Sequence, residues 1–166
     1  INMHLDMTDV LSERKPALSE THSRREALLH VAINLIWNAT YDSVGVNDIS
    51  HKAGVTKGTF YHYFKSKAEL FEAASELFWE RIKPLLDAIV SPEKTGLEQM
   101  CELARYSCRM QRYYSATGNP VAGCPFLSTA AQIGHREPLV AKAGQQMSER
   151  QIHYMEIVIK NLIREG

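Results

Sequence analysis

The chain has 166 residues, 45% of them hydrophobic and 23% charged, and its formal net charge at pH 7 is zero. This composition is that of a globular protein and excludes a chain that is disordered along most of its length. No apolar run approaches the roughly 20 residues that a membrane-spanning helix needs, and no signal-peptide pattern is visible, so we expect a cytoplasmic protein without membrane contact.

The first predicted helix follows a leader. Residues 1–22 show no sustained periodicity and include Pro16, which indicates a flexible segment. Ser23 and Glu26 then form the pattern of a capping box, in which two side chains satisfy backbone N–H groups at the start of a helix. Apolar residues recur at helical spacing from Leu28 onward, so we expect this helix to run from Ser23 to about Asn38.

Two short helices separated by a tight turn are predicted next, over residues 46–53 and 56–64. Gly54 suits the left-handed backbone position that ends a helix, and the Thr56 hydroxyl can cap the second helix by accepting from an N–H two or three residues on. This spacing is typical of a helix-turn-helix.

The rest of the chain also has helical patterns only. Capping boxes at residues 66–69 and 95–98 predict one helix reaching Val90 and another ending near Gly118. Pro125 and Pro138 suit the first turns of two more helices, which we expect to end at Ile133 and Arg164. No alternating strand pattern occurs, so the sequence predicts an all-α protein.

The second helix of the helix-turn-helix has a polar face suited to a DNA groove. Its apolar residues are spaced to pack against the preceding helix, which leaves the other face free. Lys57 can donate to guanine, Thr59 can meet a base edge or a thymine methyl, and Tyr61 and His62 can bond phosphates. The candidate DNA-binding residues are Asn47, Thr56, Lys57, Gly58, Thr59, Tyr61, His62 and Lys67.

Positive charge is concentrated around this motif. Residues 23–67 contain six Lys or Arg and three Asp or Glu, a net charge of +3, whereas residues 68–166 contain 11 and 12. The start of the helix at Ser66 presents free N–H groups beside Lys67, and we expect a DNA phosphate to dock there. Replacing Lys67 by alanine should then weaken binding to all sequences alike.

The stretch from Arg25 to Leu70, with the core AGVTKGTFYHYFKSKAEL, resembles the DNA-binding domain of TetR/AcrR-family transcriptional regulators. The resemblance implies an N-terminal three-helix helix-turn-helix domain over residues 23–67 and a helical ligand-binding and dimerisation domain over residues 68–166. It also implies a homodimer that binds an inverted-repeat operator in double-stranded DNA, and a repressor that an unknown small-molecule effector releases. Family members usually continue into another dimerisation helix, so we expect a chain that is either truncated after Gly166 or only partly ordered.

The second half of the chain is less specific. Its aromatic and methionine side chains suit either a pocket or an ordinary core, and the candidate ligand-binding residues are Tyr106, Met110, Tyr113, Cys124 and Phe126. Cys124 precedes a predicted helix, where the helix dipole favours a thiolate, so a redox or electrophile sensor is an alternative to an inert cysteine. With Cys101 and Cys108, it is expected to be a free thiol.

Enzymatic function is not expected. The sequence has no catalytic Ser/His/Asp pattern, no phosphate-binding glycine loop and no zinc-ligand spacing, so no catalytic residue, cofactor or metal is predicted. A helical binding or interaction module without sequence-specific DNA binding is the remaining alternative, and a helical lipid carrier is a more distant one.

Overall fold

The computed structural model describes the backbone of residues 20–115 and 123–165, and the side chains of residues 24–112 and 123–165. Over these ranges the chain is helical without a strand, which confirms the all-α prediction. The elements are α2 (Glu20–Asn38), a short 3-10 helix η1 (Tyr41–Ser43), α3 (Val46–Lys52), α4 (Lys57–Tyr63), α5 (Lys67–Ile89), α6 (Gly96–Ser115), α7 (Pro125–Ile133) and α8 (Pro138–Glu165).

The start of the first helix was predicted incorrectly. Helix α2 begins at Glu20, so the backbone at Ser23 already lies inside the helix and Ser23 is not its cap. Residues 20–22 include neither glycine nor proline, and nothing in their backbone preferences interrupts a helix. Residues 20–22 of the predicted leader therefore belong to α2, and residues 1–19 lie outside the described part of the chain.

The predicted helix caps at Thr56 and Ser66 are confirmed. The Thr56 hydroxyl accepts from the N–H of Thr59 at 3.1 Å, and the Ser66 hydroxyl accepts from the N–H of Glu69 at 3.1 Å. Gly54 has a φ of 66°, the left-handed conformation expected between the two short helices. Each cap of this kind contributes about 1 kcal/mol, so the bounds of α4 and α5 follow from local sequence.

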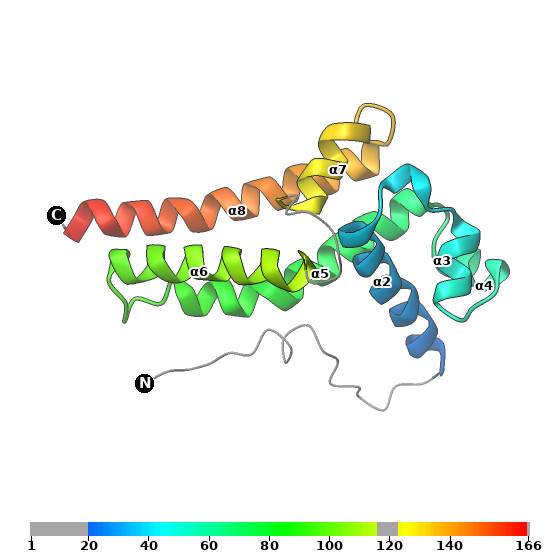
Figure 1. Cartoon of the computed structure of the whole chain (residues 1–166), viewed down its shortest axis with the longest axis horizontal. Coiled ribbons are helices and arrows are strands. Elements are labelled where there is room, and N and C mark those ends of the chain that lie inside the picture. The colour runs from blue at the N-terminus through cyan, green and yellow to red at the C-terminus, as the bar shows by residue number, and fades with distance from the viewer. Residues whose placement is uncertain (1–19, 116–122, 166) are drawn as a thin grey trace.

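The helices form a small head and a longer body (Figure 1). Helices α3 and α4 lie at one end beside α2 and the start of α5, while the rest of α5 runs alongside α6 and α8. Helix α7 packs against the first half of α8 and also contacts α2, so it joins the body to the head. None of the described helices is long and apolar enough to cross a membrane.

Phe126 lies at the centre of the core where α5 and α7 meet. Its side chain is fully buried, and its ring centroid lies 5.7 Å from that of Phe71 and 5.0 Å from that of Phe78. Nearby, α7 and α8 approach so closely that a Cβ on Gly144 would lie 2.2 Å from the Cβ of Ala130. A glycine at this position is therefore required by the packing of the two helices.

Helix α6 buries Gln99, Tyr106 and Met110. Tyr106 and Met110, which were expected to line a pocket or an ordinary core, are buried, and Leu103 packs against the same core. Gln99 Nε2 donates to two loop carbonyls, and its Oε1 accepts from an α8 asparagine at 2.9 Å. These polar contacts offset the burial of a glutamine, which apolar periodicity alone does not predict.

Candidate nucleic-acid interface

The two short helices share one apolar contact and leave one face of α4 in solvent. Ile49, Phe60 and Phe64 are buried, and Ala53 and Val55 pack against the same cluster. This is the packing that the sequence predicted for a helix-turn-helix. Because Phe60 points inward, the opposite side of α4 lies on the surface.

The surface of α4 has the predicted polar and aromatic side chains. Lys57, Gly58 and His62 are exposed, and the Tyr61 side chain is 49% exposed. The Lys57 ammonium lies 6.0 Å from the centroid of the Tyr61 ring, so the two groups occupy neighbouring parts of this face. Such a combination of cation, phenol and imidazole can bond base edges and phosphates.

Asn47 and Thr59, two further residues predicted to contact DNA, differ in their solvent exposure. Asn47 is exposed in the first turn of α3. Thr59 is half-buried, and its hydroxyl lies 2.9 Å from that of Thr56, which already caps α4. A base contact from Thr59 would therefore involve its methyl group or the free lone pairs of its hydroxyl.

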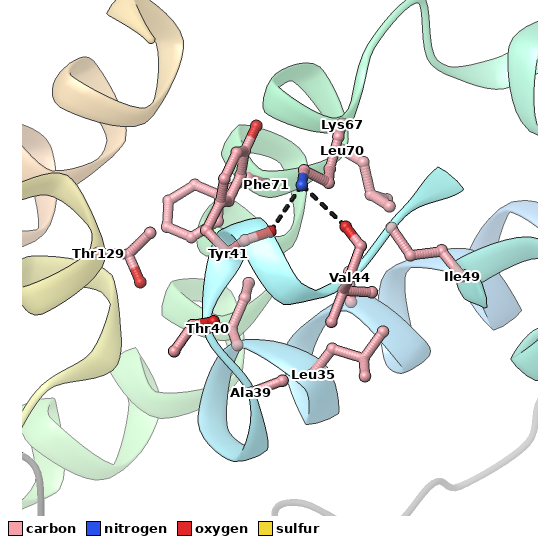
Figure 2. Close-up of a pocket in the computed structure, with 12 residues that line it drawn as sticks. Leu35, Ala39, Thr40, Tyr41, Val44, Ile49, Lys67, Leu70, Phe71 and Thr129 are labelled. Carbon is pink, nitrogen blue, oxygen red and sulfur yellow. Dashed lines mark hydrogen bonds between the residues drawn. The ribbon is translucent and has the colours of Figure 1, made fainter. Parts of the chain in front are cut away.

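Lys67 does not extend outward as expected. Its ammonium donates to the Tyr41 carbonyl at 2.6 Å and to the Val44 carbonyl at 2.8 Å (Figure 2). It also lies 3.9 Å from the centroid of the Tyr41 ring. Loss of water around this half-buried group lowers the pKa of Lys67 from its ordinary value. The side chain predicted to bind a phosphate is instead hydrogen-bonded within the domain. Its partners are distant in sequence, so local sequence patterns could not reveal these bonds.

The segment between α2 and α3 also contacts the body. Asp42 forms an ion pair with Arg136, which lies between α7 and α8. Burial, together with the negative charges of Glu137 and Asp42, raises the pKa of Tyr41 to about 12. A cavity of about 40 Å³ lies beside Tyr41 (Figure 2). Apolar side chains of α2, α3 and α5 line it, together with residues 39–41 and 44, Lys67, and Thr129 of α7. At this volume it holds no more than a few water molecules and is too small for an organic ligand.

A larger cavity lies in the body and has a volume of about 250 Å³. Of the candidate ligand-binding residues, Tyr106, Met110 and Cys124 line it. Phe126 does not, because it is enclosed in the core, and the side chain of Tyr113 lies outside the described part of the chain. Phe78 of α5, one of the aromatic side chains that suited a pocket, also lines the cavity, whereas Trp37, Ile82, Leu86, Gln151 and Met155 were not predicted.

Comparisons with known proteins agree with this geometry. Residues 28–74 match the family model described as "Bacterial regulatory proteins, tetR family". These residues comprise most of α2, the helix-turn-helix and the first turns of α5. No solved structure gave a significant match to the chain.

Several curated relatives are similar to longer stretches. The transcriptional repressor KstR2 of Mycolicibacterium smegmatis is 36% identical over 48% of this chain and 42% of its own length. The transcriptional regulator AcuR of Cereibacter sphaeroides is 30% identical over 76% of this chain and 62% of its own length. The nucleoid occlusion factor SlmA of Shewanella loihica is 25% identical over 90% of this chain and 73% of its own length. The chain thus spans less than two thirds of KstR2 and AcuR.

Proposed function

The chain belongs to the tetR family of bacterial regulatory proteins, and from this we propose that it is a dimeric repressor released from an inverted-repeat operator by a small molecule. The observation that carries the proposal is the exposed face of α4. It has Lys57, Tyr61 and His62 in solvent on a capped helix that the buried side of the motif holds in place. In this proposal α4 is the recognition helix, and it enters the major groove.

We propose that the head contacts DNA in two ways. Lys57, Gly58 and Thr59 face the base edges, while Asn47, Thr56, Tyr61 and His62 contact the backbone or adjacent bases. At the start of α5, the backbone N–H groups in the first turn offer a phosphate site that does not depend on the Lys67 side chain.

An apolar stripe on α8 supports a homodimer. Ile152, Met155, Ile159 and Ile163 are exposed and recur every three or four residues, so they lie on one side of the helix. Several exposed isoleucines on one side of a helix are unusual for a surface that faces only water. A second copy that buries the same stripe would give a two-fold dimer with two recognition helices, which suits an inverted repeat.

The body cavity supports a site for the effector. Its walls come from α2, α5, α6 and α8, and the start of α7 closes one side. None of the described residues that line it carries a charge, so a charged ligand would lose its hydration without a partner. Gln111, Cys124 and Gln151 supply polar groups. We therefore propose an uncharged, mostly apolar effector with one hydrogen-bonding group.

Cys124 favours a second candidate function, that of an electrophile-responsive regulator. Its Sγ lines the cavity, accepts from Gln151 Nε2 at 3.4 Å and belongs to the residue that precedes α7. In this version an electrophile in the cavity alkylates the thiol. A Cys124→Ser protein that still responds to the effector would exclude it.

The recognition surface is tested by selecting binding sites from random duplexes. We expect the wild-type protein to enrich an inverted repeat, and Lys57→Met to relax the preference at one base pair in each half-site. The loss of one base contact should reduce discrimination there by about 1–3 kcal/mol.

Lys52→Met is the matched control, because Lys52 is an exposed cation on α3, the other helix of the motif. It should leave the enriched sequence unchanged and lower affinity for all duplexes slightly. Failure of the wild-type protein to enrich any inverted repeat would contradict the proposal and favour a binding module without sequence-specific recognition.

The effector class is tested with two probes of the same shape. We expect 2-naphthol, which is uncharged below pH 8, to raise the thermal unfolding midpoint, and 2-naphthoate, its anionic counterpart, to leave it unchanged. A ligand at 100 times its dissociation constant stabilises the folded state by about 2.7 kcal/mol.

Met110→Trp is the variant for this test, because Met110 lines the cavity and a larger side chain would fill it. The shift caused by 2-naphthol should disappear in this variant. An equal or larger shift with 2-naphthoate would contradict an uncharged effector.

A further inference from the structure

We infer that Lys67 is a positioning residue that holds the helix-turn-helix at a set distance from α5, and that it is not a phosphate ligand. Its ammonium bridges the Tyr41 and Val44 carbonyls at 2.6 and 2.8 Å. Figure 2 shows both bonds converging on one nitrogen. The inference concerns how the proposed recognition helix is placed, and its DNA-binding part rests on the proposed function.

The geometry leaves little of the ammonium for another partner. A lysine has three N–H donors, and two of them are used by carbonyls. The ring of Tyr41 covers the nitrogen at 3.9 Å, within the range of a cation–π contact. Binding a phosphate through this side chain would require breaking both hydrogen bonds and leaving two carbonyls unpaired.

We call the two hydrogen bonds from Lys67 to the Tyr41 and Val44 carbonyls the Lys67 brace. Both carbonyls lie in the segment that leads into α3, so the brace can fix the position of the recognition helix. Val44 directly precedes Gly45, the N-cap residue of α3, and α3 packs against α4. The other end of α4 connects to α5 through residues 64–66. Lys67, the first residue of α5, thus closes a ring of contacts that runs through η1, α3 and α4 and returns to α5.

The exposed neighbour Lys65 provides a contrast. It lies two residues earlier in the chain, and its side chain is in solvent. Its backbone N–H donates to a Glu69 carboxylate oxygen at 2.6 Å, while its ammonium stays available for DNA. If charge near the start of α5 attracts a phosphate, Lys65 is better placed to do so than Lys67.

The brace is tested first in the wild-type protein without DNA, by amine acetylation followed by mass spectrometry. We expect Lys57 and Lys65 to react rapidly and Lys67 at least about tenfold more slowly, because its nitrogen is bonded and covered. Its lowered pKa would by itself accelerate the reaction, so slow labelling reports burial and hydrogen bonding. Labelling of Lys67 as fast as that of Lys65 would overturn the inference.

The positioning role is tested with Lys67→Met, which keeps the apolar stem and removes the donors. We expect its affinity for the selected operator to fall about tenfold or more, while its affinity for random duplex and the salt dependence of that binding stay unchanged. A phosphate ligand would behave differently, since each lost contact lowers the salt slope by about 0.9 and weakens both duplexes alike. That second pattern, expected for the control Lys65→Met, would refute the inference if Lys67→Met showed it.

Further measurements distinguish a loss of positioning from unfolding of the variant and from failure of the proposed function. Circular dichroism must show that Lys67→Met is folded at the assay temperature; if it is not, Lys67→Arg takes its place. Arginine keeps the charge and binds phosphate well, so preserved operator affinity in Lys67→Arg would contradict positioning. If no operator is enriched, the proposed function fails, while the labelling rates still decide whether the brace exists.

Discussion

Ile159→Glu is expected to convert the proposed dimer into a monomer and to reduce its affinity for the selected operator by about 100-fold or more. Ile159 is exposed in the middle of the α8 stripe, and a glutamate buried there against a second copy would lack a partner. A dimer binds two half-sites on one duplex, and separating the heads removes the effective-concentration gain of about 10²–10⁴. Sedimentation equilibrium and titration with the selected operator measure the two effects.

Lys160→Glu is the matched control for this change. Lys160 is the next residue of α8, lies off the stripe and is exposed. Its substitution alters the charge of the helix by more than Ile159→Glu does, yet the dimer should persist. A dimeric Ile159→Glu protein would show that the stripe is not the interface, whereas equal dissociation in both variants would point to a general charge effect.

Phe126→Ala is expected to destabilise the protein by about 3–5 kcal/mol, the usual cost of removing a fully enclosed phenylalanine. Phe126 is fully buried, and its ring contacts Phe71 and Phe78. Unfolding in urea at a fixed protein concentration measures the loss, because the stability of the proposed dimer would depend on concentration.

An exposed aromatic residue is the control for Phe126. Tyr61→Ala removes a side chain of similar size from the surface of α4 and should change stability by no more than about 0.5 kcal/mol. The two variants thus separate a core role from a binding role. If Phe126→Ala unfolded like the wild type and lost only its response to 2-naphthol, the cavity would extend to Phe126 and the core assignment would be wrong.

Most of the secondary structure could be predicted because the signals that set it are local. The caps at Thr56 and Ser66 join atoms three residues apart, and the turn at Gly54 depends on one backbone conformation. The same locality explains the face of α4. Phe60 must point inward, so its exposed neighbours follow from helical geometry. The beginning of α2 was missed because Ser23 fits a cap but also tolerates a place inside a helix.

The sequence by itself therefore determined an all-α chain with a capped helix-turn-helix and the side chains on its outer face. Only the tertiary structure decided where Lys67 points, because its partners lie 26 and 23 residues earlier in the chain. Only packing separated Phe126, enclosed in the core, from Met110 at the cavity wall. Hydrogen bonds within a helical turn join residues close in sequence and can be predicted from it. The Lys67 hydrogen bonds, the cavities and the buried helix faces depend on which helices pack together in the fold.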